Sequence, residues 1–173
     1  LLAREFPEQM RESLGDDKQK KAARYLTDPG ISIVRDAHIA THAGRLTAMH
    51  DPTEGGLAAA LWEMADASGR CLVIEPSKVY ITDLAAEVCE CFKIDPFASL
   101  ASGALLLTTP QSDAKAILQA FQAANIRCNE IGHAENGDPN VIAWDGNTRT
   151  KFPRPERDEM GKVFNSWSGF PSV

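Results

Sequence analysis

The residues best suited to chemistry lie together in HDPTEGG, residues 50–56, directly before a run of apolar residues at helical spacing. A glycine in the first turn of a helix costs up to about 1 kcal/mol relative to alanine, so Gly55-Gly56 indicates a backbone that must stay bare. Uncovered N–H groups at a helix N-terminus can bind a phosphate or a carboxylate. The same glycines could instead allow close packing of the helix, and the sequence leaves both interpretations open.

Four polar side chains precede the glycines, and each has a structural and a chemical interpretation. Asp51 or Thr53 can cap the helix by accepting a hydrogen bond from a backbone N–H two or three residues on. Glu54 would repel a bare phosphate unless Mg²⁺ bridged the two groups, so a metal-bound nucleotide is the expected anion, and Asp51 could join its site. His50 titrates near neutral pH, although a lone histidine at the end of a strand is more often structural.

Two further groups of residues could carry chemistry. Ser102-Gly103 precedes a buried apolar segment, and it is either a simple strand start, which the pattern favours, or a second wall of the same cleft. His38 and His42 have a spacing that could bind zinc on a helix. No third ligand is evident in the sequence, so an exposed helix face is the favoured interpretation.

The four cysteines, at positions 71, 89, 91 and 128, form no C-x-x-C pair. On a helix over 83–93, Cys89 and Cys91 would point about 200° apart, so they are not expected to share a metal ion. The sequence therefore predicts buried, reduced thiols in a cytoplasmic protein, and no metal site.

Alternating helices and strands must position these residues. Helices are expected over 31–43, from the 53–57 start to Ser68, over 82–92 with a Thr/Asp cap, and over 112–125 with a side-chain cap. Strands are expected over 45–49, 71–76, 102–110, 126–134, 140–144 and 148–152, with Asp145-Gly146-Asn147 turning a hairpin. This order predicts an α/β or α+β fold in which helices pack on a layered, mixed β-sheet.

Length and charge limit the possible classes of protein. The chain has 173 residues, of which 43% are hydrophobic, as expected for one soluble globular domain. A net charge of −6 gives no electrostatic footprint for nucleic acid or an anionic membrane, and no apolar run approaches the roughly 18–20 residues of a membrane-spanning helix. We expect residues 1–27 to be a lead-in of two short helices broken at SLGDD, 28–152 to be the domain, and 153–173 to be a loosely held tail.

Three segments, HDPTEGGLAAALWEMADASG, FKIDPFASLASGALLLTTP and IRCNEIGHAENG, together resemble the C-terminal domain of the aminoimidazole-ribonucleotide (AIR) synthase superfamily. Their order and spacing carry the likeness, which covers roughly residues 28–152. It is greatest to the hydrogenase expression/formation (maturation) branch, whose Asp-Pro-Thr-x-Gly-Gly-Leu motif opens the same helix. The first residue is Leu1, and the chain begins as though inside an element, so we expect a piece of a longer protein.

The resemblance implies the C-terminal half of an ATP-dependent enzyme. A missing N-terminal domain would supply most of the ATP and Mg²⁺ site and the contacts of a homodimer, while this domain closes the cleft; alone it is expected to be inactive and to bind no cofactor tightly. Asp51, Thr53, Gly55, Gly56 and Leu57 match the family motif, and Ser102-Gly103 resembles its small-residue loop. With the interpretations above, the cleft-lining set is His50, Asp51, Thr53, Glu54, Gly55, Gly56, Ser102 and Gly103.

Two departures from the maturation branch leave the substrate unassigned. Position 54 is glutamate where that branch has arginine, and no cysteine follows Cys128, whereas that branch ends in a Pro-x-x-Cys tail. The alternatives are a non-catalytic binding or assembly module, or a maturation protein without its terminal cysteine.

Overall fold

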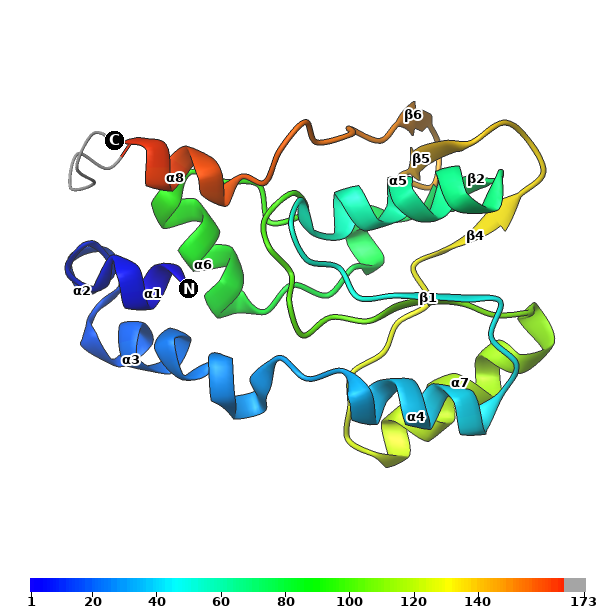
Figure 1. Ribbon diagram of the computed structural model, residues 1–173, viewed down its shortest axis with the longest axis horizontal. Helices are drawn as coiled ribbons and strands as arrows, with labels where there is room; N and C mark the ends of the chain where they lie inside the picture. The colour runs from blue at the N-terminus through cyan, green and yellow to red at the C-terminus, as the bar shows by residue number, and fades with distance from the viewer. Residues whose placement is uncertain (167–173) are drawn as a thin grey trace.

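The computed structural model describes residues 1–166, in which short strands and helices alternate after a helical N-terminal segment (Figure 1). The helices are α1 (Leu2–Glu5), α2 (Pro7–Leu14), α3 (Asp16–Arg24), α4 (Val34–Ala43), α5 (Gly56–Ser68), α6 (Asp83–Phe92), α7 (Gln111–Ala123) and α8 (Met160–Ser166), with a kinked turn at Leu26–Gly30 and a 3-10 turn at Pro76–Lys78. The strands are β1 (Ala48–His50), β2 (Cys71–Ile74), β3 (Leu106–Thr108), β4 (Gly132–Glu135), β5 (Asn140–Trp144) and β6 (Arg149–Lys151).

The strands form two sheets. In the larger sheet, of order β4-β2-β5-β6, β2 runs antiparallel to β4 and parallel to β5, and β5 is antiparallel to β6. The smaller sheet pairs β1 with β3 antiparallel, with Met49 opposite Leu107. The mixed sheet with packed helices confirms the predicted α+β fold.

Helix α5 covers one face of the larger sheet. Alternate residues of β2, Leu72 and Ile74, point with Val141 of β5 into a core shared with Leu61 and Ala65 of the helix. All five side chains are at most 6% exposed. This core fixes the axis of α5 and therefore the position of its N-terminal turn.

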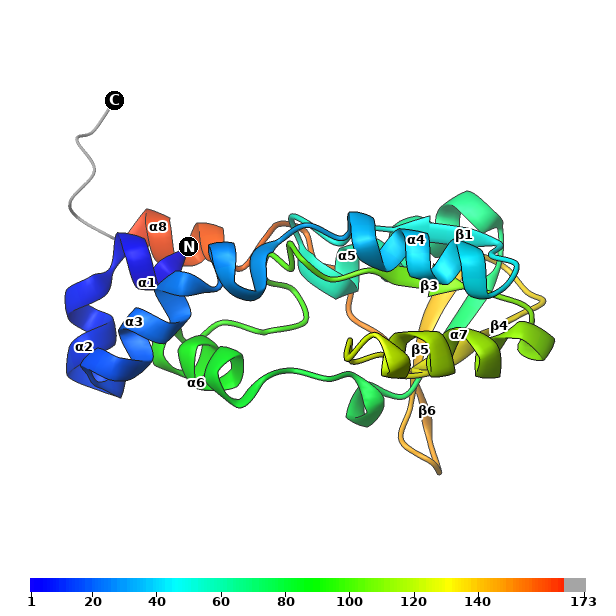
Figure 2. The ribbon, with the colours of Figure 1, turned by 90° about the horizontal axis from the view of Figure 1, so that it is seen from below.

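Two smaller cores complete the fold. One joins α1, α2, α6 and α8 through Phe6, Met10, Phe92 and Val163, and the other joins α4 and α7 through Ala40, Ile117 and Phe121. In Figures 1 and 2 the first group of helices lies at one end of the molecule, and the sheets lie with α4, α5 and α7 at the other.

Several local predictions can be compared directly with the structure. The hairpin is confirmed, since the Asp145 carboxylate accepts hydrogen bonds from the N–H groups of Asn147 and Thr148, and Thr82 caps α6 by accepting from Ala85. The predicted side-chain cap of α7 is wrong: Pro110 is its N-cap residue, and the Asp113 carboxylate instead accepts a hydrogen bond from the Arg45 N–H.

The expectation of a loosely held tail is wrong for residues 153–166. Phe152 is buried in the main core, and its N–H donates to the Val141 carbonyl. The chain then passes the N-terminal turn of α5 and ends in α8, where Val163 joins the helical core. Residues 152–159, which we name the strap, therefore connect the two ends of the molecule. Residues 167–173 of the predicted tail lie outside the described part of the chain.

Candidate functional site

The turn before α5 places its two glycines against a neighbouring loop. Gly55 and Gly56 have φ of 74° and 60°, the left-handed region that favours glycine. A Cβ on Gly56 would lie 2.7 Å from the Phe97 carbonyl oxygen and closer still to that of Ser99. At Gly56 the bare backbone therefore allows close packing, which was one of the two interpretations that the sequence left open.

The N–H groups at this turn have acceptors within the protein. Gly55 N–H donates to Asp158 Oδ2 at 2.6 Å, Gly56 N–H to the Thr53 carbonyl at 3.0 Å, and Ala58 N–H to the Phe97 carbonyl at 2.8 Å. These bonds use three of the donors from which a phosphate at the helix N-terminus could accept.

The predicted cap by Asp51 or Thr53 is wrong. The N-cap residue of α5 is Gly55, which has no side chain. The helix therefore has no side-chain cap at this residue. The helix begins at Gly56, and the Gly56 N–H donates to the backbone carbonyl of Thr53 and not to a side chain of the preceding turn.

The polar side chains of the turn face outward. Asp51, Thr53 and Glu54 are exposed, whereas Pro52 between them is fully buried and anchors the segment. Among residues 1–166, the three exposed side chains have no hydrogen-bond or ion-pair partner. Two carboxylates and a hydroxyl are therefore available to a ligand.

The second candidate segment lies beside the first. Ala101 N–H donates to the Thr53 carbonyl at 3.3 Å, which links the loop before Ser102-Gly103 to the turn. Ser102 and Gly103 are exposed, and a Cβ on Gly103 would lie 3.2 Å from the Ile31 Cα. The structure thus brings 53–56 and 101–103 together, and it adds Phe97 and Ser99, which carry no local signal in the sequence.

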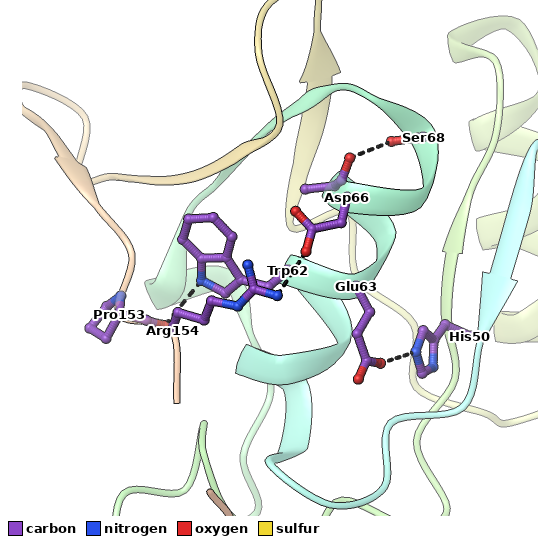
Figure 3. Close-up of polar contacts among 8 residues, drawn as sticks. His50, Trp62, Glu63, Asp66, Ser68, Pro153 and Arg154 are labelled. Carbon is purple, nitrogen blue, oxygen red and sulfur yellow. Dashed lines mark hydrogen bonds and ion pairs between the residues drawn. The ribbon is translucent and has the colours of Figure 1, made fainter. Parts of the chain in front are cut away.

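His50 has a separate environment. Its Nε2 lies 2.5 Å from Glu63 Oε2 on α5, and its Nδ1 is buried without a partner in residues 1–166 (Figure 3). The His50 side chain is 27% exposed and that of Glu63 58%. The histidine therefore joins β1 to the middle of α5, while the glycine turn lies at the end of that helix.

The strap contacts the same helix through Trp62, a contact that the sequence analysis missed. The indole N–H donates to the Pro153 carbonyl at 3.3 Å, and the Arg154 guanidinium lies 5.3 Å from the ring centroid (Figure 3). Arg154 also pairs with Asp66 at 2.8 Å. An indole N–H on an apolar helix needs an acceptor when buried, which is the one sequence signal that could have indicated this contact.

Within residues 1–166, the two histidines of α4 and the four cysteines have no hydrogen bond or ion pair with the residues of the turn before α5. His38 and His42 are both exposed, and His42 Nδ1 lies 2.6 Å from the His38 carbonyl oxygen. The four cysteines are free and half-buried, and burial raises the pKa of the Cys89 and Cys128 thiols. In the part of the chain that the structure describes, no group of three or more His, Cys, Asp and Glu side chains could hold a metal ion, and no helix is long and apolar enough to cross a membrane.

Comparison with known proteins identifies relatives of this arrangement. The model of the family "AIR synthase related protein, C-terminal domain" matches residues 8–145. A protein named as a hydrogenase expression/formation protein in Methanocaldococcus jannaschii is 32% identical over 100 residues, which are 57% of this chain and 30% of that protein. Carbamoyl dehydratase HypE of Rhodobacter capsulatus is 34% identical over 87 residues, 50% of this chain and 26% of that protein.

Solved structures show the same fold. The hydrogenase maturation protein HypE of E. coli superposes with a TM-score of 0.67 at 19% identity, over 76% of this chain and 42% of that one. A HypE structure in complex with ATP gives a TM-score of 0.57 at 16% identity, over 83% of this chain and 41% of that one. The chain thus matches less than half the length of each of these relatives. The resemblance inferred from the three sequence segments is confirmed.

Proposed function

Since the chain belongs to the family of AIR synthase-related C-terminal domains, we propose that it is one half of an ATP-dependent enzyme and closes the cleft of an N-terminal ATP-binding domain. Its ligand-facing surface consists of the 51–54 turn and the 101–103 loop. We further propose that the whole protein is a cytoplasmic homodimer; the four free thiols support a reducing compartment.

One observation carries the proposal: the exposed side chains of Asp51, Thr53 and Glu54 have no partner in residues 1–166, although a buried proline and a backbone hydrogen bond to Ala101 hold their segment. Exposed polar side chains on a backbone segment that packing holds, with no internal partner to compete for them, are available to a ligand. The comparisons add support, because a relative of the same fold is HypE in complex with ATP.

The residues present fit Mg²⁺ better than a bare phosphate. Mg²⁺ bound with a nucleotide takes one or two carboxylates together with phosphate oxygens, and Asp51 and Glu54 are free carboxylates. The metal would offset the repulsion between Glu54 and a phosphate. The helix N-terminus itself is not part of the proposed contact, because the N–H groups of Gly55, Gly56 and Ala58 already have acceptors.

The test uses the longer protein that contains both domains. Binding and hydrolysis of ATP are measured with and without Mg²⁺ for the parent, for Glu54→Ala, and for Glu12→Ala, a control at an exposed glutamate of α2. Loss of a charge-assisted contact predicts roughly tenfold weaker binding for Glu54→Ala in Mg²⁺ and little change without it. The 173-residue chain alone is expected to hydrolyse no ATP. Equal Mg²⁺-dependent affinity in the parent and Glu54→Ala would count against the proposal, and absence of ATP binding would favour a non-catalytic module.

A further inference from the structure

Asp158 joins the beginnings of two helices with one carboxylate. Its Oδ2 accepts the hydrogen bond from the Gly55 N–H at 2.6 Å, and its Oδ1 accepts one from the Met160 N–H at 2.7 Å. Gly55 is the N-cap residue of α5, and Met160 is the first residue of α8. A negative group at a helix N-terminus is stabilising, and here it serves two helices at once.

The contacts on both sides of Asp158 determine where this carboxylate lies. Before it, Pro153 accepts from the Trp62 indole. After it, Glu159 N–H donates to the Ala98 carbonyl at 3.1 Å, which ties the strap to the loop that packs on Gly56. Val163 then anchors α8 among Phe6 and Phe92. The carboxylate is therefore supported from the sheet end and from the helical end of the molecule.

We propose that Asp158 is a positioning residue for the candidate site, because it holds Gly55 in its left-handed conformation and so sets the direction in which Asp51, Thr53 and Glu54 project. A shift of α8 would act on the turn through the same carboxylate, which makes the strap a mechanical link between the helical core and the ligand-facing surface. The role of the turn in ligand binding rests on the proposed function; the link itself does not.

The chemistry of the carboxylate provides a selective test. A carboxylate offers two acceptor oxygens, whereas an asparagine amide offers one oxygen and an NH₂ donor. Asp158→Asn can keep the local bond to Met160, as asparagine does in helix N-caps, and must then present an N–H donor to the Gly55 N–H. Asp158→Ala removes both acceptors. If Asp158 only added to overall stability, Asp158→Asn would affect the Gly55 and Met160 amides alike.

Amide hydrogen exchange of the 173-residue chain, followed residue by residue by NMR, measures the result. In Asp158→Asn we expect the Gly55 amide to exchange about tenfold faster or more, while that of Met160 changes little; in Asp158→Ala both accelerate. Glu156→Gln, an exposed carboxylate of the same strap, is the control and should leave both unchanged.

Two results would overturn the assignment. One is an unchanged Gly55 amide in both Asp158 variants, and the other is acceleration that extends equally to β2 and β5, as in general destabilisation. Because no nucleotide enters this measurement, it can fail while Glu54→Ala still weakens Mg²⁺-dependent ATP binding, and it can succeed when that effect is absent. The two proposals are therefore tested separately.

Discussion

The close packing at Gly56 leads to a quantitative prediction for Gly56→Ala. A left-handed conformation costs an alanine about 1–2 kcal/mol. The new Cβ would also lie 2.7 Å from the Phe97 carbonyl oxygen and closer to that of Ser99, both of them backbone atoms that no side-chain rotation can move. Overpacking of this kind costs roughly 1–3 kcal/mol more. We expect Gly56→Ala to destabilise the chain by about 2–5 kcal/mol.

Gly69, at the other end of the same helix, provides a matched control. It has φ of 63°, against 60° for Gly56, and no atom lies within 4 Å of a Cβ placed on it. Gly69→Ala therefore carries only the conformational cost, about 1–2 kcal/mol. The difference between the two variants isolates the contact between the α5 turn and the 97–99 loop.

Urea unfolding followed by circular dichroism gives the free energies of unfolding of the three proteins. For a chain of this length, each kcal/mol corresponds to roughly 2–4 °C in Tm, so a thermal scan gives a second measurement. Equal destabilisation by Gly56→Ala and Gly69→Ala would refute the reasoning, because it would mean that the 97–99 loop moves aside without cost.

Two further predictions concern the strap and the sheet. Trp62→Phe removes the hydrogen bond to the Pro153 carbonyl and some packing, so urea unfolding should show a loss of about 1–2 kcal/mol, and an unchanged midpoint would contradict the contact. The Arg149 guanidinium and then His133 lower the pKa of Glu135 from 4.5 to about 2, so the ion pair stabilises the fold above about pH 4.5 and this contribution is lost as the pH falls towards 2. Glu135→Gln should therefore be less stable than the parent near pH 6, with a difference that shrinks below pH 4.5; a difference independent of pH would argue against this pairing.

The features that the sequence predicted correctly depend on neighbouring residues. Asp145 reaches N–H groups two and three residues on, and Thr82 reaches one three residues on, so both turns follow from local spacing. Helix α5 was evident because its apolar residues recur at the helical period, and most of them are buried in the structure. The polar turn at 51–54 could also be found in the sequence, because it directly precedes this helix.

The features that the sequence did not predict depend on residues far apart in the chain. Asp158 lies 103 positions from Gly55, and Pro153 lies 91 positions from Trp62. The three prolines and the SWSG run of residues 153–173 suggested a loose segment, because composition does not show that a proline carbonyl can accept from a distant indole. The cap of α5 was assigned wrongly because a nearby Asp51 satisfies the local rule, while the actual acceptor comes from another part of the molecule.

In HDPTEGG the glycines are buried and pack against the protein, whereas Asp51, Thr53 and Glu54 are exposed and face outward. This difference determines which variants can test the site. A bulky substitution at Gly56 would disturb the packing with Phe97 and Ser99, so a loss of ATP binding in such a variant would report on folding. Substitution of Glu54 should leave that packing intact, because its side chain is exposed and has no hydrogen-bond or ion-pair partner within residues 1–166. Only the second kind of variant can separate a ligand-facing surface from a well-packed helix start.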